Sequence, residues 1–194
     1  MTGWALAAVT VAYAAFLAMS YNRFVRARQH LRESWSGIDV ELRRRYDLVP
    51  TLVATVKGHA AHEQRLLEQV LASRTRAQAN RGAHDTQIRD ETALAESLAS
   101  LLAVAERYPE LTADESFRDL QARLTETEDR LAVARRHHNA NVREWQTLGE
   151  SFPSKLARGL VRWRPEPYFA VPPAVRDRPD VAGSAPHASG GSLL

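Results

Sequence analysis

The sequence predicts an all-α protein in which an N-terminal transmembrane helix continues into an elongated antiparallel bundle of about four long helices, followed by a disordered C-terminal tail. Three observations favour this fold class. An uncharged apolar run comes first, apolar residues then recur at helical spacing, and few of the nine glycines interrupt the body of the chain. Alanine, leucine, arginine, glutamate and glutamine are frequent in that body, and all five favour helix. No alternating strand pattern appears in it.

The apolar run covers residues 3–20 and contains no charged side chain. About 20 apolar residues cross a bilayer, so this run is just long enough, with Trp4 and Tyr21 as interfacial anchors. A cleaved signal peptide is the alternative, but the positive segment that should precede its apolar region is missing. We therefore expect residues 1–22 to form an uncleaved anchor that contacts the lipid bilayer through residues 3–20.

Arginines follow the anchor at once, at Arg23, Arg26, Arg28 and Arg32, whereas no charged side chain precedes it. The positive-inside rule places such a flank in the cytoplasm. The expected location is therefore the cell (inner) membrane, as a single-pass protein with its N-terminus outside and its soluble bundle in the cytoplasm.

The overall composition excludes several classes of site. The 26 basic residues are balanced by 23 acidic ones, largely interleaved, which is typical of solvated helix surfaces and not of a nucleic-acid interface. The absence of cysteine excludes a disulfide framework, a zinc–thiolate site, an iron–sulfur cluster and a cysteine nucleophile. No Walker loop or nucleophile-elbow motif is present, so we expect no enzyme and no cofactor.

The bundle is expected over residues 23–164, and its first helix continues directly from the anchor. Phe24, Leu31 and Ile38 lie seven residues apart, which is the 3.5-residue period of helices packed lengthwise, as in a coiled coil. Pro50 removes a backbone donor, and Asp47 is a suitable N-cap before it. These two residues predict a kink or a tight break at 47–50.

Three further helices and a tail complete the prediction. The second helix is expected over 50–79, the third over 85–107, and the fourth over 113–148, with a short helix at 154–161. Thr112 and Glu115 match a capping box at the start of the fourth helix, and Gly149 is a natural stop. Six of the nine prolines lie at or after Pro165, so residues 165–194 are predicted to be a mostly disordered Pro/Gly-rich tail.

Polar residues on or beside the apolar stripes predict a structural polar layer inside the bundle. They are Asp39, Arg44, Arg45, Asp47, Glu63, Glu106, Glu128, Arg135 and Asn141. Charges there must be paired, because leaving one buried partner alone costs roughly 3–5 kcal/mol. Such layers fix the register of packed helices. A groove for a ligand or a partner protein is the alternative interpretation.

His59, His62 and Glu63 form the most metal-like cluster, since helical spacing brings His59 close to the other two. Their order differs from the His-Glu-x-x-His helix of zinc proteases, and the Glu-x-x-His of di-iron bundles is absent. A polar pair inside the bundle is the simpler interpretation, so the three residues stay metal candidates only.

Several ordered motifs resemble the LemA family over about residues 21–170. They are Tyr21-Asn22, Trp35, Ile38-Asp39, Leu42-x-Arg44-Arg45-x-Asp47-Leu48-x-Pro50, Val56-Lys57-Gly58, His62-Glu63, Tyr108-Pro109, Thr127-Glu128, Ala134-Arg135-Arg136, Asn141, Phe152-Pro153 and Tyr168-Phe169. Two positions depart from the family pattern. His137-His138 stands where the family usually has a tyrosine near an asparagine, and Trp145-Gln146 replaces a more polar pair.

The resemblance implies a bacterial single-pass membrane protein with an elongated helical bundle and no agreed enzymatic activity. A magnetosome-associated branch of the family suggests roles in organising membranes. We therefore expect a membrane-anchored scaffold or interaction protein that binds a protein partner or self-associates through its bundle surfaces. The alternatives are a metal-dependent, membrane-tethered enzyme using His59, His62 and Glu63, and an envelope-stress regulator of a membrane protease or kinase.

Overall fold

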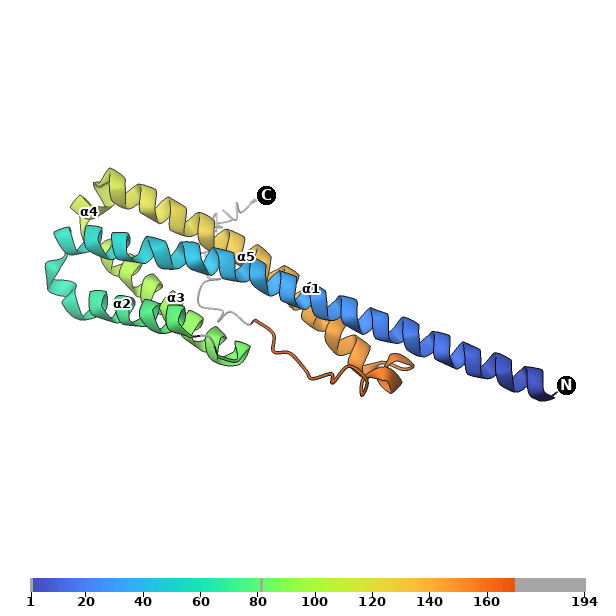
Figure 1. The fold of residues 1–194 in the computed structure, drawn as a ribbon. Helices are drawn as coiled ribbons and strands as arrows, with labels where there is room; N and C mark the ends of the chain where they lie inside the picture. The colour runs from blue at the N-terminus through green and yellow to red at the C-terminus, as the bar shows by residue number, and fades with distance from the viewer. Residues whose placement is uncertain (1, 81, 170–194) are drawn as a thin grey trace, which may run out of the picture.

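The computed structural model describes residues 2–80 and 82–169, and within these ranges the protein contains helices and no strand (Figure 1). The elements are α1 (Thr2–His59), the 3₁₀ turn η1 (Ala61–Glu63), α2 (Gln64–Ala79), α3 (His84–Ala105), the short α4 (Pro109–Ala113), α5 (Glu115–Glu150) and the 3₁₀ turn η2 (Ser154–Ala157). The all-α prediction is confirmed.

The bundle is elongated, as predicted, because its two longest helices lie side by side in opposite directions (Figure 1). α5 packs along α1 from its C-terminal end back to the part around Phe24, and the α2–α3 pair lies beside the C-terminal half of α1. The N-terminal part of α1 extends beyond every other element. It carries exposed apolar side chains such as Trp4, Leu6 and Val9, and α1 is long and apolar enough there to cross a membrane.

The predicted break at 47–50 is wrong, because α1 continues through Pro50 to His59. Proline cannot donate the hydrogen bond that would satisfy the carbonyl oxygen four residues earlier. That carbonyl belongs to Tyr46, and the Nε of Arg74 on α2 donates to it at 3.0 Å. With the orphaned acceptor satisfied, Val49 and Leu52 stay buried on either side of the proline.

The first two helices therefore separate at η1, and α2 begins at Gln64 rather than at residue 50. Asp47 lies inside α1 as an exposed helical residue and caps nothing. Because α1 is not interrupted, a single helix connects the apolar segment to the bundle core.

Asp114 caps α5, and its side chain accepts a hydrogen bond from the backbone N–H of Phe117 at 2.9 Å. The capping box predicted from Thr112 and Glu115 is wrong, because the Thr112 hydroxyl donates to the Pro109 carbonyl of α4 instead. The predicted third and fourth helices otherwise correspond to α3 and α5. The short helix predicted at 154–161 is reduced to the single 3₁₀ turn η2.

Two apolar clusters hold the bundle together. The larger lies at the far half, where α1, α2, α3 and α5 meet around Leu42, Leu94 and Leu131. The smaller lies near the end from which the anchor emerges, where Phe24 and Trp145 pack edge to face with a centroid distance of 5.8 Å. α1 contributes residues to both clusters.

The first residues of the predicted tail, 165–169, pack against the bundle, and Phe169 is buried. The rest of the predicted tail, residues 170–194, lies outside the described residues.

Candidate functional site

Two polar sites are built into the bundle, and the first is a buried charge network centred on Arg45. This side chain is only 1% exposed on α1. Its guanidinium pairs with Glu91 on α3 and donates to Oε1 of Glu128 on α5 at 3.0 Å. The Tyr46 hydroxyl donates to the other oxygen of Glu91. The network therefore ties three helices together through charge-assisted hydrogen bonds.

Burial and partner charges set the protonation of this network. Burial alone would lower the pKa of Arg45, but the carboxylates of Glu128 and Glu91 outweigh it and leave that pKa raised. Burial and the hydrogen bond to Glu91 raise the pKa of the Tyr46 phenol. Burial lowers the pKa of Arg135, whose Nη2 lies 3.4 Å from Oε2 of Glu128. Arg135 also stacks over the Phe169 ring, with its guanidinium carbon 5.1 Å from the ring centroid.

The structure brings together three residues of the predicted polar layer, Arg45, Glu128 and Arg135, and adds two that sequence reasoning missed, Tyr46 and Glu91. The remaining predicted members lie elsewhere: Arg44 pairs with Glu41, Asp39 with Arg43, Glu63 with Arg107, Asn141 donates to the His30 carbonyl, and Asp47 and Glu106 are exposed. The single layer predicted for all nine residues is therefore wrong, and the true network is smaller and deeper.

The metal candidates do not converge. Glu63 receives hydrogen bonds from Arg107 at 2.9 Å and from the Tyr108 hydroxyl at 3.2 Å. His59 faces Asp114, with 4.0 Å between Nε2 and Oδ2, and His62 is exposed. Within residues 2–80 and 82–169, no group of three or more acidic or histidine side chains is arranged to hold a metal ion. The shared face expected for these residues is lost because α1 ends at His59, before the other two.

The second polar site is a cleft of about 370 Å³, which we call the arginine cleft. It lies between α1, the start of α3, α5 and the segment that follows η2. Four arginines line it, Arg28, Arg32, Arg162 and Arg164, together with the acidic Glu166. Trp35 stacks on His84 with ring centroids 3.7 Å apart. Nδ1 of His84 lies 3.5 Å from Glu166, and this contact lowers the pKa of that carboxyl group.

His138 lies at the base of the arginine cleft and is held neutral. Burial, reinforced by the nearby His84, lowers its pKa to about 4. Its Nδ1 lies 3.0 Å from the Ser34 oxygen, and the Ser34 hydroxyl donates to the Leu31 carbonyl. With the Ser34 hydroxyl donating to the Leu31 carbonyl, an Nδ1–H of His138 can donate to the Ser34 oxygen, so a backbone acceptor for the serine proton is present beside the histidine.

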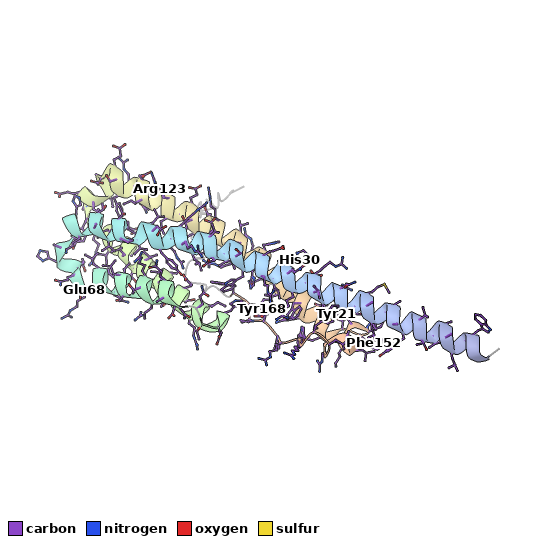
Figure 2. All side chains as sticks on the ribbon, viewed as in Figure 1. Tyr21, His30, Glu68, Arg123, Phe152 and Tyr168 are labelled. Carbon is purple, nitrogen blue, oxygen red and sulfur yellow. The ribbon has the colours of Figure 1, made fainter. Side chains whose placement is uncertain are left out.

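Residues 162–169, which we call the strap, close one side of the cleft. Side chains of α5 bind the strap backbone: Trp145 Nε1 donates to the Arg164 carbonyl at 2.7 Å, and Gln146 donates to the Glu166 carbonyl at 3.0 Å. Asn139 both donates to and accepts from the backbone of Phe169. The Tyr168 hydroxyl donates to Gln146 at 2.7 Å. The strap is therefore an ordered part of the bundle, with Tyr168 beside α5 (Figure 2).

The two departures from the family pattern lie at this site. His138 forms the base of the cleft, and Trp145 and Gln146 hold the strap. A cleft with four guanidinium groups, aromatic faces and one carboxylate is suited to binding an anionic or acidic group. Sequence reasoning missed it because Trp35, His84, His138 and Glu166 come from four segments far apart in the chain.

The comparisons with known proteins agree with the resemblance. The LemA family matches residues 34–182. The chain is 24% identical to Magnetosome protein MamQ 1 and to MamQ 2 of Paramagnetospirillum magneticum, and 22% identical to Magnetosome protein MamQ of Magnetospirillum gryphiswaldense. Each match covers 84% of this chain and 70% of the relative.

Together with the exposed apolar part of α1, these matches support a membrane-associated helical protein. Because the family match includes the whole buried network and the cleft-lining residues from Trp35 onward, the chain belongs to the LemA family.

Proposed function

We propose that this protein is a single-pass membrane scaffold that carries a rigid helical bundle and presents its surface to protein partners or to further copies of itself. The observation that carries this proposal is the continuity of α1. Its first part is exposed and apolar, and its later part supplies Phe24, Leu42 and Val49 to the bundle cores. The bundle is thereby coupled to the bilayer without a hinge, and anchoring concentrates its surfaces at the membrane.

The two polar sites support a structural role over a catalytic one. Arg45 and Glu91 are buried and Glu128 is partly exposed, and all three are occupied in ion pairs between helices, which favours a structural role for this network. The arginine cleft is open, but His138 in it is neutral and lies within hydrogen-bonding distance of Ser34, whose hydroxyl donates to the Leu31 carbonyl. We therefore propose that the bundle acts by binding and not by turnover. The MamQ relatives are magnetosome proteins, which supports a role in organising membranes.

In-cell photo-crosslinking tests the scaffold proposal. A photoreactive amino acid at the exposed Val133 on α5 or Leu71 on α2 should form discrete cross-linked species identifiable by mass spectrometry. The same amino acid at the buried Leu94 is the matched control and should link only within the chain. Cross-links to a second copy would show self-assembly, and cross-links to a membrane protease or kinase would show a regulator. A monomer in detergent with no cross-linked partner would refute the scaffold.

Topology and metal content need separate measurements. With the arginine-rich flank in the cytoplasm, a reporter fused after Leu194 should show cytoplasmic activity; activity of a periplasm-only reporter there would reverse the orientation. Elemental analysis of the purified full chain, alongside a His59→Ala variant, should find no stoichiometric metal in either. Metal present in the unmodified chain and lost in the variant would favour the enzyme alternative.

A further inference from the structure

The loop after α5 exposes an unusual concentration of apolar surface. Phe152 is 80% exposed, Leu156 is 60% exposed and Leu160 is 62% exposed. Among the described residues beyond Tyr21, no other large apolar side chain is as exposed; the next is Val133 at 56%, which stands alone on α5. Single exposed apolar residues are ordinary, but three within one short loop mark an interaction surface.

This loop lies against the end of the apolar segment of α1. Phe152 and Pro153 share a small cavity with Phe16, Met19 and Ser20 of α1. Ala157 of η2 is buried in the same cluster as Phe24. Figure 2 shows Phe152 and Tyr21 at the end of the bundle from which α1 emerges alone.

The position of the loop along α1 sets its depth relative to a bilayer. Residues 3–20 rise roughly 27 Å at ~1.5 Å per residue, close to the ~30 Å hydrocarbon thickness. Met19 and Ser20 then lie at the boundary between hydrocarbon and headgroups. The loop that packs on them is therefore held at the same boundary, with its exposed apolar side chains at the depth of the lipid–water interface.

Basic side chains surround this apolar surface. Lys155, Arg158 and Arg162 are exposed within or at the end of the loop, and Arg23 of α1 lines the same cavity as Phe152. Apolar residues flanked by lysine and arginine are typical of segments that lie in a membrane interface and contact anionic headgroups. The charge and the continuity with the anchor both point to lipid as the occupant.

We propose that residues 152–162, which we call the interfacial loop, insert Phe152, Leu156 and Leu160 into the lipid interface of the leaflet from which α1 emerges. The bundle then touches the membrane at two points, the anchor and the end of α5. This inference rests on the proposed function, because it requires residues 3–20 to occupy the bilayer.

Depth-dependent quenching on the full chain tests the proposal. The protein contains no cysteine, so single-cysteine variants carry an environment-sensitive fluorophore at one defined position. Leu156→Cys probes the loop, Leu6→Cys probes the anchor, and Leu71→Cys on α2 is the matched control, since all three leucines are exposed. Each variant is reconstituted in vesicles of phosphatidylcholine and phosphatidylglycerol, with a quencher attached near the top of the acyl chains.

With the loop in the interface, the probe at Leu156→Cys should lose about half of its fluorescence to the lipid quencher, while the probe at Leu71→Cys should lose less than about a tenth. Quenching of Leu6→Cys without quenching of Leu156→Cys would overturn the interfacial loop and leave the anchor intact. A blue-shifted but unquenched Leu156→Cys probe would show contact with a second copy and would also overturn it. No quenching of Leu6→Cys would refute the anchor itself.

Discussion

The Nε of Arg74 on α2 donates a hydrogen bond to the carbonyl oxygen of Tyr46 on α1, at the acceptor that Pro50 leaves without a helical donor. We expect Arg74→Ala to lower the free energy of unfolding by about 1 kcal/mol or more, because a partly buried carbonyl loses its partner. Thermal unfolding followed by circular dichroism on the full chain in detergent measures the change. Arg76→Ala is the matched control, since the Arg76 side chain donates to Ser73 within α2 itself.

The same relationship predicts a coupling between two helices. Pro50→Ala restores the N–H that can donate to Tyr46, so Arg74→Ala should cost little in a Pro50→Ala background. A double-mutant cycle should therefore give a clear interaction energy between positions 50 and 74. Strictly additive effects would mean that Arg74 does not compensate for the proline.

The Arg45 network predicts a large effect of a single substitution. Glu91→Ala leaves a buried guanidinium short of one carboxylate and removes the acceptor of Tyr46, so we expect a loss of roughly 3–5 kcal/mol. Arg44→Ala removes only an exposed pair with Glu41 and should cost less than about 1 kcal/mol. Urea unfolding of both variants makes the comparison. Equal small effects would show that the network is not a determinant of bundle stability.

His138 predicts a pH dependence with a defined sign. Its native pKa of about 4 lies below the ordinary histidine value of 6.5, so the unfolded chain binds a proton that the native chain excludes. Stability should therefore fall as pH drops from 6.5 to 4 and level off below 4, with a total loss of about 3.5 kcal/mol at ~1.4 kcal/mol per pKa unit.

Thermal unfolding across this pH range compares His138→Gln with His137→Gln. The first should flatten this component of the pH profile, and the second, at an exposed neighbour whose charge is the smallest cause of the low His138 pKa, should leave most of it in place. The groups that face His138 include Ser34 and Trp35 on α1, His84 on α3 and Glu166 in the strap. An unchanged profile in His138→Gln would assign the acid sensitivity to another group.

Gly149 predicts a steric effect on the strap. A Cβ at this position would overlap the Trp163 ring, whose Nε1 donates to the Trp145 carbonyl at 3.0 Å. Gly149→Ala should therefore displace Trp163, shift tryptophan fluorescence toward that of exposed indole, and destabilise the bundle by about 1–3 kcal/mol. Gly37→Ala, in open space inside α1, should instead stabilise it by up to about 1 kcal/mol. Native-like fluorescence in Gly149→Ala would contradict the close contact.

Periodicity was sufficient to predict the helices but not their ends. The stripe of Leu94, Leu98 and Leu101 identifies α3 because burial of one helical face repeats in the sequence. The continuation of α1 through Pro50 could not be predicted, because the compensating donor, Arg74, lies 28 residues after the Tyr46 acceptor and on another helix.

The two polar sites also differ in how far the sequence could predict them. Glu91 lies three residues before Leu94, on the buried face of α3, so an acidic residue on an apolar stripe was a usable signal that was missed. The arginine cleft gave no such local signal. Arg28, Arg32 and Trp35 do lie on one face of α1, but the cleft is completed only by the start of α3, by α5 and by the strap that turns back along α5.

The uninterrupted α1 also fixes a distance. Residues 21–59 rise roughly 58 Å at ~1.5 Å per residue, and no break within α1 shortens that path. When α1 stands along the membrane normal, the turn at η1 is held at that height above the bilayer surface. A partner recognised there must reach the same height, so the length of one helix selects which membrane-bound neighbours can meet it.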